Sequence, residues 1–384
     1  MIRILFTGGG TGGHIYPILA VAEELQISGA SNIEMELRYF GVSGNYKKLL
    51  EENGIKVSGI FSAKLRRYSD IRNLVDILFF LPLSCIQALW KVFWFMPDIL
   101  FSKGGPGALP VVLACRLYRI PVIIHDSDSI MGLANKLSSH FAQRIAVSFS
   151  SAIEDLAQKN PKLSGKTALI GNPVRRSLLS AVVDSQAAKK LFGFDSEKPV
   201  ILVIGGSQGA VKINNFIVET AAELVKKFQI LHQTGIKNFD SAKTELNSIL
   251  QNFSEEEKKN YKLIPYFEKD MADAYSAADL VISRASSGSI FEIAFFGKPS
   301  ILIPLPEEVV GVHQTKNAYE YAKTGAGIVI EEPNLKQNLF MAQLEKIFLN
   351  PERFKSMSAA AKQFSKPQAG KMIAEEIFRM IERS

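Results

Sequence analysis

Short apolar runs recur along the first half of the chain, and each is followed by a stretch with the 3.6-residue spacing of a helix buried on one face. Strands that are buried on both faces have continuous apolar sequences of this kind. The alternation of these runs with helices predicts βα units around a parallel sheet. We expect strands at Arg3–Thr7, Leu37–Gly41, Ile99–Ser102, Val122–His125 and Ile145–Ser148. Helices are expected at Ile15–Gln26, Tyr46–Asn53, Leu109–Tyr118 and Gly132–His140.

The same pattern starts again at residue 200, after a connection rich in proline and glycine. Strands are expected there at Val200–Ile204, Gln229–Gln233, Tyr261–Ile264, Leu280–Ser283, Ser300–Pro304 and Gly327–Ile330. A chain of 384 residues is also longer than one ordinary domain. The pattern therefore predicts an α/β protein with two Rossmann-like domains that face a cleft.

One segment, Leu74–Met96, is almost long and apolar enough to span a membrane. Polar residues and a proline interrupt it, which favours an apolar helical hairpin, part core and part surface. Basic and aromatic side chains in and before it suit a helix that lies on anionic lipid. They are Lys64, Arg66, Arg67, Arg72, Phe79, Phe80, Trp90, Phe93, Trp94 and Phe95. A buried helix or a dimer face is the alternative.

The chain carries a net charge of +7, which suits nucleic acid, an anionic membrane surface or a phosphorylated substrate. No predicted helix has a dense basic stripe interleaved with aromatics, so nucleic acid is the least favoured of the three. The two cysteines, Cys85 and Cys115, lie in apolar surroundings and are expected to be reduced core thiols of a cytosolic protein. The N-terminal residues predict a strand and not a signal peptide.

The first glycine turn, Gly8–Gly13, holds five glycines in six residues between a predicted strand and a predicted helix. Its G-x-G-x-x-G spacing matches a dinucleotide fingerprint, which requires an acidic residue at the end of the second strand. Glu34 and Glu36 precede that strand, so the pattern argues against a nicotinamide-dependent dehydrogenase. Five glycines exceed what a tight turn needs, and they suit close approach of a phosphate to the helix N-terminus.

His14 directly follows the first glycine turn, at or beside the first turn of the predicted helix. The positive end of a helix dipole disfavours the imidazolium, so the ring is expected to be neutral near pH 7 and able to accept a proton. Two interpretations remain open: a general base that faces the cleft, and a structural histidine that caps the helix.

The second half of the chain offers three polar clusters after predicted strands. The second glycine turn, Gly205–Gly209, places Ser207 and Gln208 beside backbone donors. Later, a strand ends at Arg284 and a helix opens, with Glu292 in its first turn, where a carboxylate can bind two vicinal hydroxyls. The third cluster comprises His313, Gln314 and Asn317. Ordinary turn and helix-cap chemistry would also account for the first two clusters.

Taken together, "TGGGTGGHIYPILAVAEEL", "GNPVR", "GGSQGA", "SSGSIFEIAFFGKPSILIPLP" and "HQTKNA" closely resemble the MurG family of glycosyltransferase family 28, in the same order along nearly the whole chain. The resemblance implies a GT-B fold, with the donor bound mainly by the C-terminal domain and a lipid-linked acceptor approached through the N-terminal one. It also implies that the last helix returns to the first domain. The expected domains are therefore 1–164 plus 366–384, and 165–365.

The resemblance also implies which residues meet the donor, UDP-GlcNAc. Glu292 would bind the ribose hydroxyls, Gln314 the sugar, and Phe267 would lie at the uracil. Other implied donor contacts are Thr11, Gly12, Gly13, Arg175, Ser207, Gln208, Arg284, Ser287, Gly288, Ser289, Ile290 and Phe291.

The chain departs from the family pattern at His125–Ser129, which reads "HDSDS" where the family usually has "HEQN". Asp128 replaces an asparagine that helps to bind the donor, and Asp126 replaces a glutamate. Pro106 replaces the common tyrosine after the two glycines of "SKGGPGALP". The Asp126-Ser127-Asp128 run mimics a metal-binding DxD motif, but helix dipoles and cationic side chains can hold the diphosphate, so no essential metal is expected.

The implied reaction is inverting transfer of GlcNAc to the MurNAc 4-hydroxyl of undecaprenyl-diphospho-MurNAc-pentapeptide, which turns lipid I into lipid II in peptidoglycan synthesis. His14 is the first candidate base and Asp126 the second, while Arg175, Arg284 and the glycine-turn N–H groups would stabilise the diphosphate. The expected location is the cytoplasmic face of the plasma membrane, with cell-wall synthesis or division proteins as partners. The alternatives are a relative with another lipid acceptor and an enzyme of the UDP-GlcNAc 2-epimerase type.

Overall fold

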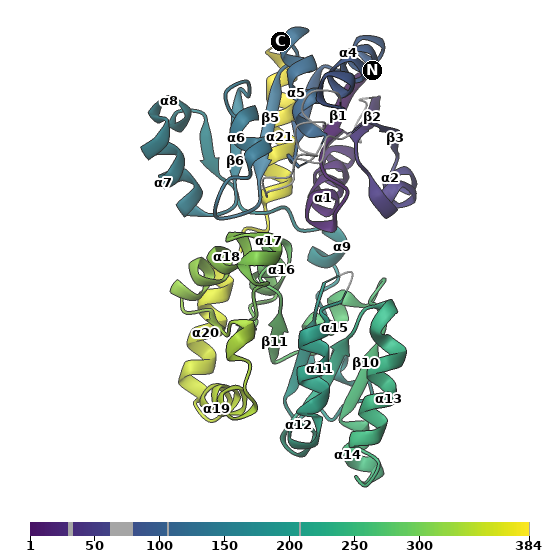
Figure 1. Cartoon of the computed structure of the whole chain (residues 1–384), viewed down its shortest axis with the longest axis vertical. Coiled ribbons are helices and arrows are strands. Elements are labelled where there is room, and N and C mark those ends of the chain that lie inside the picture. Colours follow the sequence, from purple (N-terminus) through teal and green to yellow (C-terminus); the bar gives the residue numbers. More distant parts are fainter. Residues whose placement is uncertain (30–33, 62–79, 106, 207–208, 384) are drawn as a thin grey trace. The chain divides into compact units, whose positions relative to one another are not determined.

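The computed structural model describes residues 1–29, 34–61, 80–105, 107–206 and 209–383 (Figure 1). The chain forms two compact units, Met1–Arg176 with Lys366–Ser384, and Ser177–Ser365. The first boundary therefore lies after residue 176 and not after residue 164 as expected. The reason is a short strand at Thr167–Leu169, which pairs with the sheet of the first unit and so keeps the supposed connection within it.

Unit 1 is built on a seven-stranded parallel sheet with the strand order β3-β2-β1-β4-β5-β6-β7. Its strands are β1 (Ile2–Thr7), β2 (Met35–Gly41), β3 (Ile55–Gly59), β4 (Ile99–Ser102), β5 (Val122–Asp126), β6 (Arg144–Val147) and β7 (Thr167–Leu169). The central strands are covered on both faces, which explains their uninterrupted apolar sequences. The edge strands β3 and β7 are partly exposed and lack that signal, and the sequence did not predict them.

The helices of unit 1 include the last helix of the chain, which packs on the first. They are α1 (Gly12–Gly29), α2 (Lys47–Glu52), α4 (Leu81–Phe95), α5 (Ala108–Leu117), α6 (Leu133–Ser138), α7 (Ser150–Lys159), α8 (Pro161–Ser164) and α21 (Ala369–Glu382). α21 buries Ile373, Ala374 and Ile377 in the same core as Ile15 and Ile18 of α1. Its return to unit 1 from Lys366 follows from this packing.

Unit 2 has a six-stranded parallel sheet with the order β10-β9-β8-β11-β12-β13. Its strands are β8 (Val200–Ile204), β9 (Gln229–Gln233), β10 (Tyr261–Ile264), β11 (Leu280–Ser283), β12 (Ser300–Leu302) and β13 (Gly327–Val329). The two units are joined by α9 (Arg176–Leu179). The helices of unit 2 are α10 (Ser185–Leu191), α11 (Val211–Glu219), α12 (Ala221–Lys227), α13 (Phe239–Ile249), α14 (Glu255–Lys259), α15 (Met271–Ala277), α16 (Ser287–Phe296), α17 (Glu307–Val310), α18 (His313–Lys323), α19 (Gln337–Phe348) and α20 (Pro351–Phe364).

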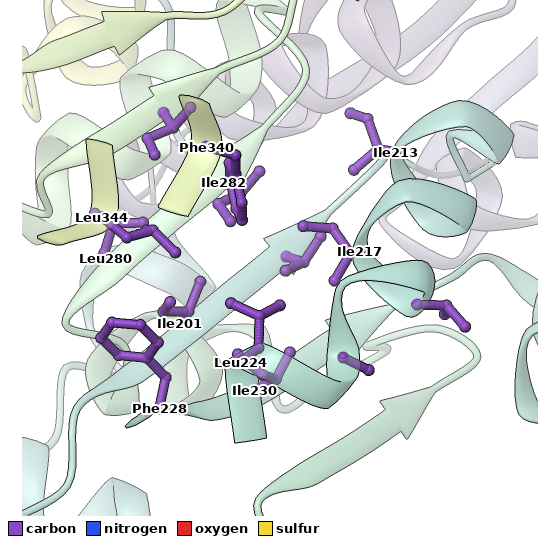
Figure 2. Packing of buried hydrophobic residues seen from close by; sticks show 14 of the residues in the cluster. Ile201, Ile213, Ile217, Leu224, Phe228, Ile230, Leu280, Ile282, Phe340 and Leu344 are labelled. Atoms are coloured by element: carbon purple, nitrogen blue, oxygen red, sulfur yellow. The ribbon is translucent and has the colours of Figure 1, made fainter. Parts of the chain in front are cut away.

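One core cluster of unit 2 lies between its sheet and the helices on one face (Figure 2). Ile201 and Ile282 from the strands meet Ile217 of α11 and Phe340 of α19, all of them fully buried. Each such side chain contributes about 1.5–3 kcal/mol by leaving water. The prediction of two Rossmann-like α/β units is confirmed by these two sheets.

Each sheet reverses its strand order beside its first strand, between β1 and β4 in unit 1 and between β8 and β11 in unit 2. Loops at the carboxyl ends of the strands diverge at such a point and leave a crevice where ligands bind. Both glycine turns lie at these points, because the first follows β1 and the second follows β8.

The apolar segment of the first half forms a single helix, α4, over its described part. Ser84, Ala88, Val92 and Phe95 face the core, while Trp90 and Trp94 are 64% and 68% exposed. Phe80 before the helix is also exposed. Lys64, Arg66, Arg67, Arg72 and Phe79 lie outside the described residues, as does the first arm of the expected hairpin. Across the described ranges, no helix is both long and apolar enough to cross a membrane.

Candidate functional site

The first glycine turn is shaped mainly by contacts within unit 1. None of its glycines has a positive φ. A Cβ on Gly10 would lie 2.9 Å from the backbone nitrogen of Gly44, and one on Gly12 would lie 3.1 Å from the Tyr46 hydroxyl. Gly13 has open space around it, with Thr11 Oγ1 at 4.0 Å as its nearest neighbour. Packing within unit 1 therefore accounts for Gly10 and restricts Gly12, while the role of the turn in binding a phosphate stays a prediction.

His14 lies in the first turn of α1, where its Nδ1 is 2.9 Å from Thr11 Oγ1. Its Nε2 points to Gly105, whose Cβ, if present, would be 3.0 Å away. Burial, and then the positive charge of Lys103, lower the pKa of His14 to about 4, against an opposing effect of Asp128. The ring is therefore neutral at pH 7, as a general base must be.

A buried polar network that the sequence analysis missed lies beside His14. Lys103, at the end of β4, is 3% exposed, and its Nζ is 2.5 Å from both His125 Nδ1 and Ser127 Oγ. Ser127 Oγ in turn donates to Asn172 Oδ1 at 2.9 Å. A lysine directly after the short strand "ILFS" was the available signal, because such a residue must find partners when it is buried.

Asp126, the second candidate base, has both carboxylate oxygens engaged. Oδ1 accepts the N–H of Asp128 at 3.0 Å, and Oδ2 accepts the N–H of Gly132 at 3.0 Å and the side-chain amide of Asn135 at 2.9 Å. Burial and the Asp128 charge raise the pKa of Asp126. These bonds organise the loop after β5 and favour His14 over Asp126 as the base.

The same loop carries the run that resembles a metal motif. In the part of the chain that the structure describes, no three His, Cys, Asp or Glu side chains gather as a metal site would require. Both oxygens of Asp126 accept hydrogen bonds from N–H groups. The absence of an essential metal stays a prediction.

Arg175 lies in unit 1 and not in the C-terminal domain to which the expected boundary assigned it. Its guanidinium stacks 4.3 Å over the ring of Tyr16, which projects from α1. Its buried Nε has no hydrogen-bond partner within the described structure. Arg175 is thus a cation held beside the first glycine turn, which is compatible with the predicted contact to the donor.

In unit 2, the second glycine turn packs tightly against the end of β9. Gly209 has a φ of +75°, and a Cβ there would lie 2.1 Å from the carbonyl oxygen of Thr234, so only glycine fits. Gln233 at the end of β9 donates to Gly206 O at 3.4 Å. Ser207 and Gln208, the predicted donor contacts of this turn, lie outside the described residues.

The N-terminus of α16 offers donors to an anion. Ser286 caps the helix by accepting the N–H of Ser289 at 3.2 Å. The hydroxyl of Ser287 is buried and has no partner among the described residues. Ile290 and Phe291, two further predicted contacts, point into the core and are fully buried, so only their main chain could meet a ligand. The unpartnered hydroxyl and the N–H groups of the first turn make this end of the helix a candidate anion site.

Glu292 stands one turn further along α16 and is half-buried. Its Oε2 accepts a hydrogen bond of 3.0 Å from the hydroxyl of Tyr275, a fully buried residue of α15. The bond fixes the carboxylate that the family resemblance assigns to the ribose hydroxyls. The sequence analysis did not identify Tyr275.

Arg284 occupies a different environment from the one expected. Its guanidinium donates to the carbonyl oxygens of Ile303 and Pro304, both at 3.2 Å, and pairs with the buried carboxylate of Glu332. These interior partners engage both terminal nitrogens of the guanidinium, and the contact of Arg284 with the diphosphate stays a prediction.

Two further predicted donor-binding residues, Phe267 and Gln314, are positioned by hydrogen bonds that involve a main-chain N–H group. Phe267 is buried edge-on against Phe192, and its N–H donates to Gln233 Oε1 at 2.9 Å. Gln233 therefore ties the loop of Phe267 to the second glycine turn. Gln314, in the first turn of α18, accepts the N–H of Leu305 at 3.1 Å. Its amide is thereby oriented beside the loop after β12.

The chain matches the model of the glycosyltransferase family 28 N-terminal domain over residues 4–147 and that of the C-terminal domain over residues 200–373. Relatives from Clostridium botulinum (strain Langeland / NCTC 10281 / Type F) and Legionella pneumophila (strain Lens) are each 36% identical to it. The alignments cover 91% and 94% of this chain and 92% of each relative. Both relatives are named UDP-N-acetylglucosamine--N-acetylmuramyl-(pentapeptide) pyrophosphoryl-undecaprenol N-acetylglucosamine transferase.

Among solved structures, MurG of Acinetobacter baumannii matches with a TM-score of 0.74 and 25% identity over 99% of this chain and 100% of that one. UDP-GlcNAc 2-epimerase from Neisseria meningitidis, bound to UDP-GlcNAc, has a TM-score of 0.68 at 16% identity and the same coverage, and this likeness concerns the fold alone. The family models and the relatives agree over both units, and the chain belongs to glycosyltransferase family 28.

Proposed function

We propose that this protein transfers GlcNAc from UDP-GlcNAc to the MurNAc 4-hydroxyl of undecaprenyl-diphospho-MurNAc-pentapeptide, with inversion at the anomeric carbon. The reaction converts lipid I to lipid II in peptidoglycan synthesis. The observation that carries the proposal is the 36% identity, over 91% of the chain, to transferases named for this donor and acceptor. The neutral His14 at the first glycine turn and the unpartnered Ser287 hydroxyl at the N-terminus of α16 support it.

His14 is the proposed general base. The acceptor 4-oxygen attacks the anomeric carbon on the face opposite UDP, its proton passes to His14 Nε2, and the bond to UDP breaks. For Nε2 to accept the proton, Nδ1 must carry the ring hydrogen and donate it to Thr11 Oγ1, which lies 2.9 Å away. Thr11 would thus set the tautomer, and a base so placed supplies about 10²–10⁴-fold in rate.

The leaving UDP gains negative charge, and dipoles and a cation are proposed to stabilise it. The N–H groups at the start of α16 and the unpartnered hydroxyl of Ser287 suit a phosphate. Arg175 would add a full positive charge, and Glu292 would bind the ribose. Asp128, Gln314, Gly12 and Gly13 remain further proposed donor contacts. With these groups, the reaction needs no essential metal.

We further propose that the α4 surface, formed by Leu83, Ile86, Trp90, Phe93 and Trp94, docks the enzyme on the cytoplasmic leaflet that holds its lipid substrate. All five side chains are at least 47% exposed. The ring of Trp94 contacts those of both Trp90 and Phe93, which makes an exposed aromatic cluster. Arg116 and Arg119 are exposed nearby on and after α5, where they would meet anionic headgroups.

Product analysis tests the proposed reaction. The protein is incubated with UDP-GlcNAc and a lipid I analogue, with and without a chelator, and the products are identified by mass spectrometry. A disaccharide product in both samples is expected. Transfer to diacylglycerol but not to the analogue would assign the enzyme to another acceptor. Release of UDP and ManNAc from the donor alone would indicate an epimerase, and loss of product with chelator would overturn the metal-free mechanism.

A further inference from the structure

We propose that Lys103 is a positioning residue of this site: its buried ammonium joins three loops at the carboxyl edge of the unit 1 sheet and places a positive charge beside His14. The relevance of this charge to catalysis rests on the proposed function. The family resemblance did not point to Lys103, and the mechanism above does not use it.

Lys103 links segments that are remote in sequence. It directly follows β4, and its Nζ reaches His125 near the end of β5, Ser127 after β5 and, at 3.5 Å, Asn172 Oδ1 after β7. Asn172 is three residues before Arg175 in the "GNPVR" segment. One side chain therefore fixes the loop of Asp128 and the segment of Arg175, both of which are proposed to meet the donor.

The direction of each hydrogen bond in this network is determined by its neighbours. His125 Nε2 lies 2.8 Å from Gly171 O, and because a carbonyl only accepts, this nitrogen carries the ring hydrogen. His125 Nδ1 must then accept from Lys103. Ser127 gives its hydrogen to Asn172 Oδ1, so its oxygen also accepts from Lys103. The amine is the donor in every contact, which is the arrangement that suits an ammonium.

Charged groups around Lys103 and His14 have opposite effects on the pKa values of these two residues. Burial lowers the pKa of Lys103 to about 7, while Asp126 and Asp128 raise it. On His14, the charge of Lys103 lowers the pKa and that of Asp128 raises it, in addition to the larger effect of burial. Lys103 and His14 both lie beside Gly8, since a Cβ built there would be 3.4 Å from Lys103 Cβ and 3.5 Å from His14 Cβ.

The first test follows the His14 ring by NMR in the unliganded full-length protein, assigned by its loss in His14→Gln. In the wild-type protein the ring should not titrate between pH 8 and pH 5. In Lys103→Met its pKa should rise by about 0.5–1 unit, because burial still acts but the neighbouring charge is gone. The control is Lys56→Met, which removes an exposed lysine on β3 of the same sheet and should leave the titration unchanged.

Two further variants keep the proposal falsifiable if Lys103→Met does not fold. Lys103→Arg retains the charge and should leave His14 close to its wild-type titration. Ser127→Ala removes one acceptor and should lower kcat/KM through the loop, without moving the pKa of His14. Two results for folded Lys103→Met would leave Lys103 a purely structural residue. One is an unchanged pKa of His14. The other is a lowered kcat/KM whose decline at acidic pH occurs at the same pH as in the wild-type protein. The NMR result stands even if lipid I proves not to be the acceptor.

Discussion

The hydroxyl of Tyr275 donates a 3.0 Å hydrogen bond to Glu292 Oε2, so a fully buried side chain on α15 orients a carboxylate on α16. Glu292 is the residue proposed to bind the ribose of the donor. Such a hydrogen bond stabilises one rotamer of the binding residue in the free protein. Less side-chain entropy is then lost when the ligand binds.

Tyr275→Phe should raise the KM for UDP-GlcNAc about 3–10-fold with little change in kcat, because it removes one hydrogen bond to a charged group and leaves the ring in place. The matched control is Tyr319→Phe. Tyr319 also donates to a glutamate, Glu331 at 2.7 Å, but lies exposed on α18, and its loss should leave KM unchanged. Equal kinetics in the two variants would contradict the positioning role of Tyr275.

His14→Gln should lower kcat by about 10²–10⁴-fold while binding of UDP-GlcNAc, measured by calorimetry, stays near the wild-type value. Glutamine retains polarity at the site but cannot take up the proton. His140→Gln, at an exposed histidine of the same unit, serves as the control. Turnover within a factor of three of the wild type in His14→Gln would remove this residue as the base.

The pH dependence of kcat/KM follows from the pKa of His14, about 4. The base works only when it is unprotonated, so activity is present above this pKa and is lost as the pH falls through it. The acidic limb should therefore lie below pH 5, whereas an ordinary histidine would place it near pH 6.5. Steady-state rates from pH 4 to pH 8, with a check that the fold persists, measure the limb. A limb centred at pH 6.5 would show that the environment of His14 does not act as described.

Gly105→Ala should lower kcat more than stability alone explains. The residue has a φ of +85°, and the new Cβ would meet His14 Nε2 and Gly9 N, both at 3.0 Å. Gly325→Ala is a closely matched control, because Gly325 has the same φ of +85° but nothing within 4 Å of its Cβ position. Both variants should lose about 1–2 kcal/mol of unfolding free energy from backbone strain, but only Gly105→Ala should lose turnover. An identical kcat in the two variants would show that Gly105 does not affect the catalytic site.

Replacing Trp90 and Trp94 together by serine should abolish co-sedimentation with anionic vesicles at low salt, because each indole adds a large apolar area to the proposed contact. Leu349→Ser, at an 80% exposed leucine of unit 2, should bind vesicles like the wild-type protein. Retained vesicle binding in the double variant, or none in the wild type at any salt concentration, would contradict docking through the α4 surface.

Much of the fold could be predicted because buried parallel strands have a strong local signal. The apolar runs at β1, β4, β5, β8 and β11 identified both sheets, and the glycine turns marked the carboxyl ends where ligands bind. β3 and β7 were missed because edge strands are short and half-exposed, and the omission of β7 displaced the domain boundary.

The parts of the site that the sequence did not reveal depend on partners far apart along the chain. Lys103 and Asn172 are 69 residues apart, and Arg284 and Glu332 are 48 residues apart. Local sequence shows Lys103 as a polar residue after a strand and Arg284 as a cation near a helix start. Only the assembled sheet edge shows that Lys103 is enclosed beside His14 and that Arg284 already has a carboxylate partner.

The packing of α21 on α1 also bears on the order in which the protein can form during synthesis. The ribosome delivers residues 1–176 first, but part of the apolar surface of α1 stays uncovered until Ile373, Ala374 and Ile377 emerge. Unit 2 is continuous in sequence and can close as soon as residue 365 is free. The nascent first unit must therefore wait, with part of its core open to solvent, while the second folds, and this interval is when chaperones and aggregation compete for it.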